Sequence, residues 1–393
     1  MTVQSMPDVS PTKWHLAHTS WFFETFLLKP YGDGYRAFDP DYHYLFNSYY
    51  EAEGPRHPRP ERGQITRPSV EEIRDYRRHV TEAMVTLLDG AADSTDWRTL
   101  VGLMELGCQH EEQHQELILT DIKHVLYQNP LLPAYGKGHP KEVRRAPQLA
   151  WAEFDGGLVE TGHDGEGFAF DCETPRHKVW LEPFRLANRL VTNGEYVAFI
   201  QDGGYRRPEL WLSDGWMTIQ EEGWSEPLYW RQSDDGWHVF TLHGAQPINL
   251  EQPVCHLSYF EADAYARWAG ARLPGEAELE VATAAQPDLG HVNDQASGHL
   301  HPDVARPGQD AGEVLQLSGD VWEWTRSAYA EYPGFKPAAG AIGEYNGKFM
   351  CNQFVLRGGS CATPGGHWRP TYRNFFPAHA RWQFTGLRLA KDL

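Results

Sequence analysis

The sequence predicts a chain of two parts, a bundle of α-helices followed by a larger α+β domain. Residues 1–127 contain three segments whose apolar positions recur at helical spacing, whereas residues 151–393 contain short strand-like pieces among many glycines and tryptophans. Twelve of the 15 tryptophans lie after residue 150, so the two parts differ in composition. A length of 393 residues is sufficient for two domains.

Three helices are expected in the first part. The first begins at residues 10–12, Ser-Pro-Thr, with the proline inside the first turn. The second opens at Ser69, and Glu72 completes the pattern of a capping box. The third extends from about Trp97 to about Tyr127. Three helices of this length indicate a bundle.

The rest of the chain is less regular. Residues 30–68 are rich in proline, glycine, tyrosine and arginine, and a loop of this length in a compact domain is usually functional. Residues 128–150 have no periodicity and are predicted to form a linker. The second domain, 151–393, contains one clear helix at 258–270.

Charge and composition exclude several classes of partner. The formal net charge of −19 repels phosphate backbones and anionic membrane surfaces, so neither nucleic acid nor a membrane is expected as a partner. No apolar run approaches the roughly 20 residues of a membrane helix, and residues 1–8 lack the pattern of a secretory signal. Five cysteines without a CxxC pair indicate reduced thiols. We therefore expect a cytoplasmic protein, and its oligomeric state stays open.

A histidine pair in the third helix gives the strongest chemical signal. His110 and His114 are four residues apart, which places both imidazoles on one face of a helix with their Cβ atoms about 6 Å apart. This spacing suits two ligands of one metal ion. The letters also fit the HExxH pattern with Glu111 as a base, but no clear third ligand follows in this helix. A third ligand is expected from the first helix, which carries His15 and His18. The spacing does not choose between iron and zinc, and a solvated polar face is the alternative.

Motifs in both parts carry a resemblance to a known family. Residues 10–18 and 21–24, together with His110-x-x-x-His114-x-Glu116, resemble the DinB-like bundle of the ergothioneine-biosynthesis sulfoxide synthases. The second part is similar to the formylglycine-generating-enzyme-like, C-type-lectin-like fold. Its motifs are Val191–Tyr196, Arg272–Glu278, Gly319–Trp324, Leu356–Ser360 and Gly386–Ala390. Both halves match in this order over nearly the whole chain.

The resemblance implies a metal and a reaction. It implies non-haem Fe(II) held by His18, His110 and His114, with His15 outside the ligand set. It also implies the O2-dependent joining of a thiol to C2 of the imidazole of Nα-trimethylhistidine, which gives a sulfoxide. The substrates are then small molecules, with O2 as co-substrate.

The resemblance also suggests residues that bind substrate. Asn374, Phe375 and Phe376 match the family's substrate segment, so the two rings are expected to contact the trimethylammonium group. Asn374 and Gln113 are expected to hydrogen-bond the histidine moiety. Without the family, core packing is the simpler interpretation of both phenylalanines. The site is expected between the two domains.

The long loop supplies the remaining candidates. Tyr49 and Tyr50 resemble the tyrosine pair of the family branch that uses free cysteine, and a phenol there can give a proton to a reactive iron–oxygen species. Which tyrosine acts stays open. Arg59 and Arg62 are candidates for the carboxylate of the thiol donor. The alternatives are aromatic packing for the tyrosines and solvation for the arginines.

The chain departs from the family pattern in places. Phe376 and Ala380 stand where branches that use γ-glutamylcysteine have Asp and Arg, which favours free cysteine and leaves a selenosugar donor, as in selenoneine synthases, as an alternative. The family has a further helix before the Ser-Pro-Thr segment, so we expect either a longer natural N-terminus or a substitute for that helix. Cys361 lacks the second cysteine of a copper pair, which argues against formylglycine generation and predicts a buried small residue.

Two other classes of function remain as alternatives. One is a DinB-like zinc thiol transferase or hydrolase, which would need zinc and ignore O2. The other is a non-catalytic lectin-like binding module with the bundle as its scaffold.

Overall fold

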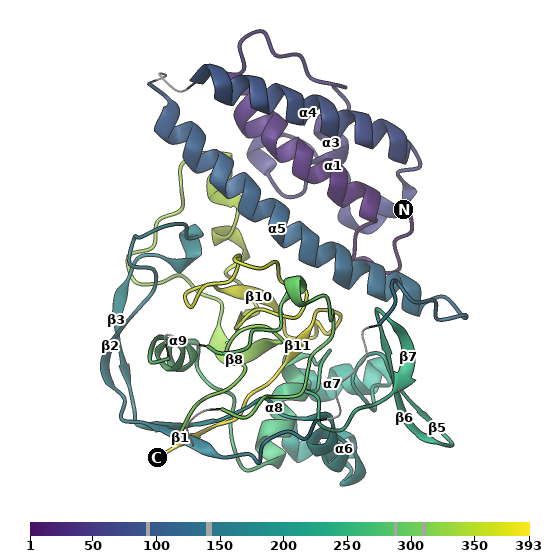
Figure 1. Cartoon of the computed structure of the whole chain (residues 1–393), viewed down its shortest axis with the longest axis vertical. Coiled ribbons are helices and arrows are strands. Elements are labelled where there is room, and N and C mark those ends of the chain that lie inside the picture. Colours follow the sequence, from purple (N-terminus) through teal and green to yellow (C-terminus); the bar gives the residue numbers. More distant parts are fainter. Residues whose placement is uncertain (92–94, 139–143, 287–288, 309–311) are drawn as a thin grey trace. The chain divides into compact units, whose positions relative to one another are not determined.

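The computed structural model in Figure 1 describes residues 1–91, 95–138, 144–286, 289–308 and 312–393. Contacts divide the chain into two compact units. The helical unit comprises Met1–Gln128 and Pro337–Lys348, and the β-rich unit comprises Asn129–Lys336 and Phe349–Leu393. Part of the predicted linker, residues 139–143, lies outside the described residues. Within the described ranges, no helix is both long and apolar enough to cross a membrane.

The helical unit is organised around its first helix. Its helices are α1 (Thr12–Phe23), α2 (Lys29–Tyr31), α3 (Tyr42–Phe46), α4 (Val70–Ala91) and α5 (Trp97–Tyr127). The three expected helices are thus confirmed. Helix α1 packs against both α4 and α5 (Figure 1), and ten of its 12 residues are buried, so it forms the core of the unit.

Local signals in the sequence set two features of this unit. At the start of α4, the N–H of Ser69 donates to the Glu72 carboxylate at 2.7 Å and the N–H of Glu72 donates to Ser69 Oγ at 3.2 Å, which confirms the capping box. Within α5, a Cβ on Gly107 would lie only 2.5 Å from Cε1 of Phe23. Glycine at 107 therefore lets α5 approach α1 closely.

Side chains of α1 fix the 30–68 segment in place. The indole N–H of Trp14 donates to the Leu45 carbonyl, and that of Trp21 donates to the His43 carbonyl, each at 3.1 Å. Lys13 Nζ donates to the carbonyl of Ile65 at 2.7 Å. The segment predicted to be a functional loop is therefore tied along the length of the central helix.

The sequence did not predict that Pro337–Lys348, which lies within 151–393, belongs to the helical unit. The carboxylate of Glu344 accepts the backbone N–H groups of Glu51 at 3.1 Å and Ala52 at 2.9 Å. Lys348 Nζ lies 2.7 Å from the same carboxylate and donates to the Tyr49 carbonyl. These contacts hold the segment against residues 49–52.

The β-rich unit contains several small sheets. Its strands are β1 (Trp151–Phe154), β2 (Gly157–Thr161), β3 (His177–Leu181), β4 (Phe184–Ala187), β5 (Trp230–Ser233), β6 (Gly236–Thr241), β7 (Gly244–Pro247), β8 (Trp322–Ala328), β9 (Gln353–Arg357), β10 (Asn374–Pro377), β11 (Thr385–Gly386) and β12 (Ala390–Asp392). They pair in the orders β1-β4-β12, β10-β9-β8-β11, β2-β3 and β5-β6-β7. Only the β11–β8 pairing is parallel among these strands.

Four longer helices accompany these sheets in the described part of the unit. They are α6 (Asn193–Gln201), α7 (Ser213–Glu222), α8 (Tyr259–Trp268) and α9 (Glu276–Ala284). Helix α8 confirms the helix expected at 258–270, and Ser258 and Glu261 form its capping box. One apolar core joins strands β1, β3, β4 and β12 to α9 through, among others, Phe184, Leu186 and Leu279.

Buried ion pairs explain several of the motifs in this unit. Arg388 Nε lies 2.8 Å from Glu323 Oε2, and both side chains are buried, so this pair joins Gly386–Ala390 to Gly319–Trp324. Within Arg272–Glu278, the two terminal residues form a pair at 2.8 Å. Charge neutralisation between fixed partners is what permits these groups inside the domain.

Candidate metal centre

Three histidines meet inside the helical unit. His18 comes from α1, and His110 and His114 come from α5. One ring nitrogen from each lies within 4.8 Å of the others, and all three side chains are buried. The ring centroids are 4.6–4.9 Å apart. The helical spacing of four residues therefore does place both α5 imidazoles beside the α1 imidazole, as a single metal ion requires.

The hydrogen bonds leave ring nitrogens available for a metal. His18 Nδ1 lies 2.7 Å from the Phe46 carbonyl, which can only accept, so the ring donates there and Nε2 keeps its lone pair. His18 Nε2 and both nitrogens of His110 are buried and have no hydrogen-bond partner among the described residues. Buried polar atoms are normally satisfied. These nitrogens therefore indicate a group that binds them.

Burial also keeps the three imidazoles neutral. Desolvation lowers the pKa of His18 and of His114 well below the usual value, and the neighbouring histidines lower both further. Desolvation, with a smaller effect of His15, lowers the pKa of His110 to about 3. Neutral imidazole is the form that binds metal, so the site is prepared for a cation at physiological pH.

His15 contacts His114 but lies outside the group that could hold a metal ion. Its Nδ1 lies 2.7 Å from His114 Nδ1, and its Nε2 lies 3.0 Å from Asp121 Oδ2. A carboxylate only accepts, so His15 donates to Asp121 from Nε2. With the proton on Nε2, His15 Nδ1 accepts from His114 Nδ1. His114 Nε2 then keeps its lone pair. The chain of contacts matches the carboxylate–histidine support that metal ligands commonly have.

The Glu111 of the HExxH pattern is committed elsewhere. Glu111 Oε1 lies 2.6 Å from an Nη atom of Arg77 on α4. Among the described residues the metal-binding group includes neither Glu111 nor Glu116. The geometry therefore does not favour a zincin-like base, and the candidate metal-binding group draws on two helices, α1 and α5.

A stack of flat side chains lies on one side of His18. The Trp14 indole stacks on the His18 ring at 4.5 Å and 17°, and the guanidinium carbon of Arg62 lies 3.4 Å from the Trp14 ring centroid. Arg62 is buried and donates to Ser10 Oγ at 2.9 Å and to Ser48 Oγ at 3.1 Å. It is thus not a solvated loop arginine. Arg59 is exposed and donates to the Asp8 carbonyl.

Three tyrosines, here called the tyrosine cluster, gather on the His110 side. The rings of Tyr49 and Tyr50 are 4.6 Å apart, and Tyr345 lies 6.1 Å from Tyr49 and 5.7 Å from His110. Tyr50 is fully buried; desolvation and the Tyr49 and Tyr345 hydroxyls raise its pKa well above the usual value. The Tyr50 phenol therefore keeps its proton at neutral pH.

Comparison with known proteins places the chain in a family. Residues 1–118 match the DinB superfamily, and residues 138–393 match the Sulfatase-modifying factor enzyme 1-like domain. The hercynine oxygenase of Mycolicibacterium thermoresistibile is 34% identical over 98% of this chain and 88% of its own. The hercynine oxygenase of Mycobacterium tuberculosis is 34% identical over 98% of this chain and 92% of its own. This chain belongs to the hercynine oxygenase family.

The family matches confirm the predicted order of a DinB-like bundle and a formylglycine-generating-enzyme-like domain. A formylglycine-generating enzyme of Streptomyces coelicolor is 29% identical over 56% of this chain and 80% of its own. That share is smaller than the share matched by the hercynine oxygenases. Cys361 is fully buried, as predicted.

Sequence reasoning missed Tyr345 in this member of the hercynine oxygenase family. The Tyr345 hydroxyl donates to Oε1 of Gln113, the side chain that was predicted to bind substrate. Gln113 lies on α5 between His110 and His114. No periodicity or motif marks Tyr345, because its contacts come from a segment far along the chain.

The predicted substrate segment forms β10 in the β-rich unit. Adjacent residues of a strand point to opposite faces, and Phe375 and Phe376 do have different neighbours. Phe375 stacks on Tyr329 at 4.0 Å, whereas Phe376 contacts Trp382 at 5.7 Å. The two rings therefore do not form one aromatic box. Asn374 Oδ1 accepts the N–H of Phe375 at 2.9 Å.

Proposed function

We propose that this chain is an O2-dependent sulfoxide synthase of ergothioneine biosynthesis, which joins free cysteine to imidazole C2 of Nα-trimethylhistidine. The reaction converts a thiol S–H, the C2–H bond and O2 into a C–S(=O) sulfoxide and one water. The substrates lose four electrons and O2 gains them. Membership of the hercynine oxygenase family supports the reaction, and the buried triad of His18, His110 and His114 is the observation that carries it.

Fe(II) is the proposed metal, and the residues present fit it. Three neutral imidazoles provide a ligand set that suits iron, and His18 and His110 have buried nitrogens without a hydrogen-bond partner among the described residues. Zinc has no redox chemistry to offer O2. When bound, the iron supplies the redox chemistry and brings O2 and both substrates together. The chain contributes orientation: Phe46 fixes the His18 ring, and His15 fixes the His114 ring.

The tyrosine cluster is the proposed source of a proton. The Tyr50 phenol remains protonated at neutral pH because burial raises its pKa, and the Tyr345 ring lies 5.7 Å from the His110 ring. Tyr49 and Tyr50 were the sequence candidates, and Tyr345 joins them. Positioned acids of this kind typically contribute about 10²–10⁴ to a rate.

Polar residues of the helical unit are proposed to bind the substrates. Gln113 is held by Tyr345 and can present its amide N–H₂ group to a substrate nitrogen or carboxylate. The buried Arg62 donates to two hydroxyls and has no carboxylate partner among the described ion pairs, which suits capture of a substrate carboxylate, and Arg59 is its exposed companion.

In the β-rich unit, the proposed contacts involve β10. Phe375 is already stacked on Tyr329, so Phe376 is the stronger candidate for the trimethylammonium group, and Asn374 is the hydrogen-bonding partner. Phe376 and the buried Ala380 offer no charge to a γ-glutamyl group. This is why we propose free cysteine as the donor.

A competition assay tests the proposal. Metal-free protein is loaded anaerobically with Fe(II) or Zn(II) and receives Nα-trimethylhistidine with equal cysteine, γ-glutamylcysteine and a selenosugar, under air or nitrogen. Mass spectrometry should detect a cysteine-linked sulfoxide only with Fe(II) and air. The variant His114→Ala should lose the product, while the exposed His291→Ala should keep it.

Each other outcome has a definite meaning. A γ-glutamylcysteine product would keep the reaction and overturn the donor, and a selenium product would place the chain with the selenoneine synthases. An equal yield from His114→Ala, or no product from the natural protein, would contradict the proposed function.

A further inference from the structure

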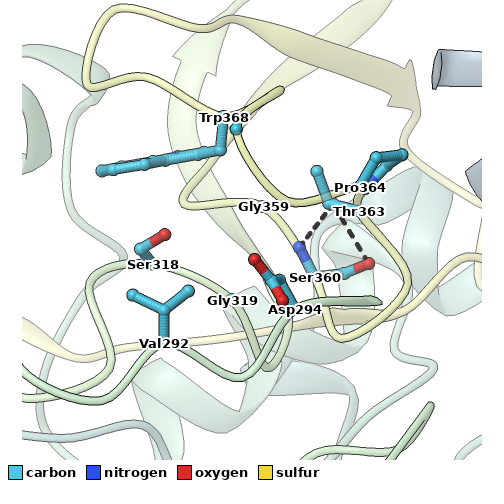
Figure 2. Close-up of a pocket in the computed structure, with 10 residues that line it drawn as sticks. Val292, Asp294, Ser318, Gly319, Gly359, Ser360, Thr363, Pro364 and Trp368 are labelled. Carbon is cyan, nitrogen blue, oxygen red and sulfur yellow. Dashed lines mark hydrogen bonds between the residues drawn. The ribbon is translucent and has the colours of Figure 1, made fainter. Parts of the chain in front are cut away.

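The β-rich unit contains a cavity of about 200 Å³ whose walls come from motifs that the proposed function does not use. Gly319 begins the Gly319–Trp324 motif and Ser318 directly precedes it, while Gly359 and Ser360 end the Leu356–Ser360 motif. Figure 2 shows the residues that line it. None of the lining residues belongs to the helical unit.

An indole ring covers one side of this cavity. In Figure 2 the indole of Trp368 is seen edge-on above Ser318 and Val292, with its flat face toward them. Gly359 makes this position possible: its φ is +77°, and a Cβ there would lie 3.2 Å from Trp368 Cδ1. A larger residue would therefore be strained in its backbone and would crowd the indole.

The opposite wall is polar and fixed. Asp294 Oδ1 accepts the N–H of Ala296 at 2.9 Å, which orients the carboxylate, and Oδ2 has no hydrogen bond from the residues that the structure describes. Thr363 Oγ1 accepts the N–H of Ser360 at 2.8 Å, and Ser360 Oγ accepts the N–H of Ala362 at 3.1 Å. Two hydroxyls are thus held in place beside the single carboxylate.

This combination has a defined binding preference. The lining contains one carboxylate and no basic side chain, so an anion is disfavoured. An aromatic face attracts a cation that carries apolar groups, since such a cation loses little hydration when it contacts a ring. We propose that this cavity binds a small organic ammonium cation, with its alkyl groups against Trp368 and its charge beside Asp294.

The proposal does not depend on the metal centre. The site uses no residue of the triad. The net charge of −19 on the whole chain also attracts a cationic ligand. A neutral polyol is the competing ligand, because hydroxyl groups can also hydrogen-bond to the carboxylate and the two side-chain hydroxyls. The experiment separates these two chemistries.

The test uses the full chain labelled with 5-fluorotryptophan and read by ¹⁹F NMR. The Trp368 resonance is assigned as the one missing from Trp368→Phe. Tetramethylammonium chloride is titrated against sodium chloride, against tert-butanol as a neutral molecule of similar shape, and against glucose. We expect a saturable shift of the Trp368 resonance with tetramethylammonium only.

Variants locate the binding. Asp294→Asn keeps the acceptor for Ala296 and should weaken tetramethylammonium binding roughly tenfold. The exposed Asp164→Asn is the matched control and should bind normally. Thermal unfolding shows whether each variant is folded, and a folded Asp294→Asn that binds normally would overturn the proposal.

The remaining outcomes are equally decisive. A shift with tert-butanol equal to that with tetramethylammonium would reduce the site to an apolar contact, and a shift with glucose alone would make it a polyol site. Either result overturns the proposal. Binding at the metal centre would shift the Trp14 resonance, because Trp14 stacks on His18. Absence of binding at the Trp368 cavity can therefore be distinguished from failure of the proposed function.

Discussion

The Nδ1 atoms of His15 and His114 lie 2.7 Å apart, with Asp121 on the far side of His15 at 3.0 Å. The Asp121 carboxylate accepts a hydrogen bond from Nε2 of His15, and Nδ1 of His15 in turn accepts one from Nδ1 of His114. A proposed metal ligand on α5 is therefore oriented by a residue of α1. Helix α1 therefore contributes a proposed ligand, His18, and also the residue that orients a proposed ligand of α5.

Loss of this support should weaken metal binding. His15→Phe keeps a ring in the core and removes both hydrogen bonds, so we expect the affinity for Fe(II) to fall about 10–100-fold. Competition with a chromogenic chelator under anaerobic conditions measures the affinity. His291→Phe, at an exposed position of the β-rich unit, should change nothing, and an unchanged affinity in His15→Phe would remove the orienting role.

The buried histidines should make the metal-free protein sensitive to acid. The pKa values of His18, His110 and His114 are lowered in the folded state, so below pH 6.5 the unfolded chain binds protons that the folded chain does not. Stability then falls as the pH decreases, by up to about 1.4 kcal/mol per pH unit for each group. Urea unfolding between pH 8 and pH 5 should show this slope. In His110→Phe the slope should be shallower, and an identical slope would contradict the assignment.

Two glycines of α5 should respond in opposite directions to the same change. Gly107→Ala forces a methyl group against Phe23 and should destabilise the chain by about 1–3 kcal/mol. Gly102 is exposed, and a Cβ at this position would have no neighbour within 4 Å among the described residues. Gly102→Ala should therefore stabilise the helix by about 0.5–1 kcal/mol. Chemical unfolding of both variants is the measurement. Equal effects would mean that α1 and α5 are not in close contact at Gly107.

Removal of the Tyr345 hydroxyl should lower the turnover rate and leave the metal affinity nearly unchanged. Tyr345→Phe retains the ring beside His110 and removes the hydrogen bond to Gln113. We therefore expect an affinity for Fe(II) within about twofold of that of the natural protein and a kcat lowered about 10²-fold or more. Tyr135→Phe, at an exposed position, should leave both values unchanged. A normal kcat in Tyr345→Phe would leave Tyr49 and Tyr50 as the proton donors.

Local patterns in the sequence predicted the helices and two of the three histidines. A spacing of four residues determines the faces of His110 and His114 from helix geometry alone. The choice of His18 over His15 needed the family resemblance, because both lie on one short helix and the deciding contact is the hydrogen bond from His15 to Asp121.

Contacts between distant segments were not predictable. Arg62 reads as a loop arginine, yet Trp14 and two hydroxyls enclose it because residues 30–68 are tied to α1. Tyr345 lies in a segment without helical or strand periodicity, and nothing local indicates that it pairs with Gln113. Phe375 and Phe376 match a substrate motif, but strand alternation, visible only once β10 is assigned, separates their rings.

The pairing of Gln113 with Tyr345 spans 232 positions of the chain. Protein synthesis proceeds from the N-terminus, and early domains generally fold first. All three histidines of the triad thus leave the ribosome long before the tyrosine that completes their surroundings. A nascent chain released before residue 345 would carry all three proposed metal ligands and lack one phenol of the tyrosine cluster.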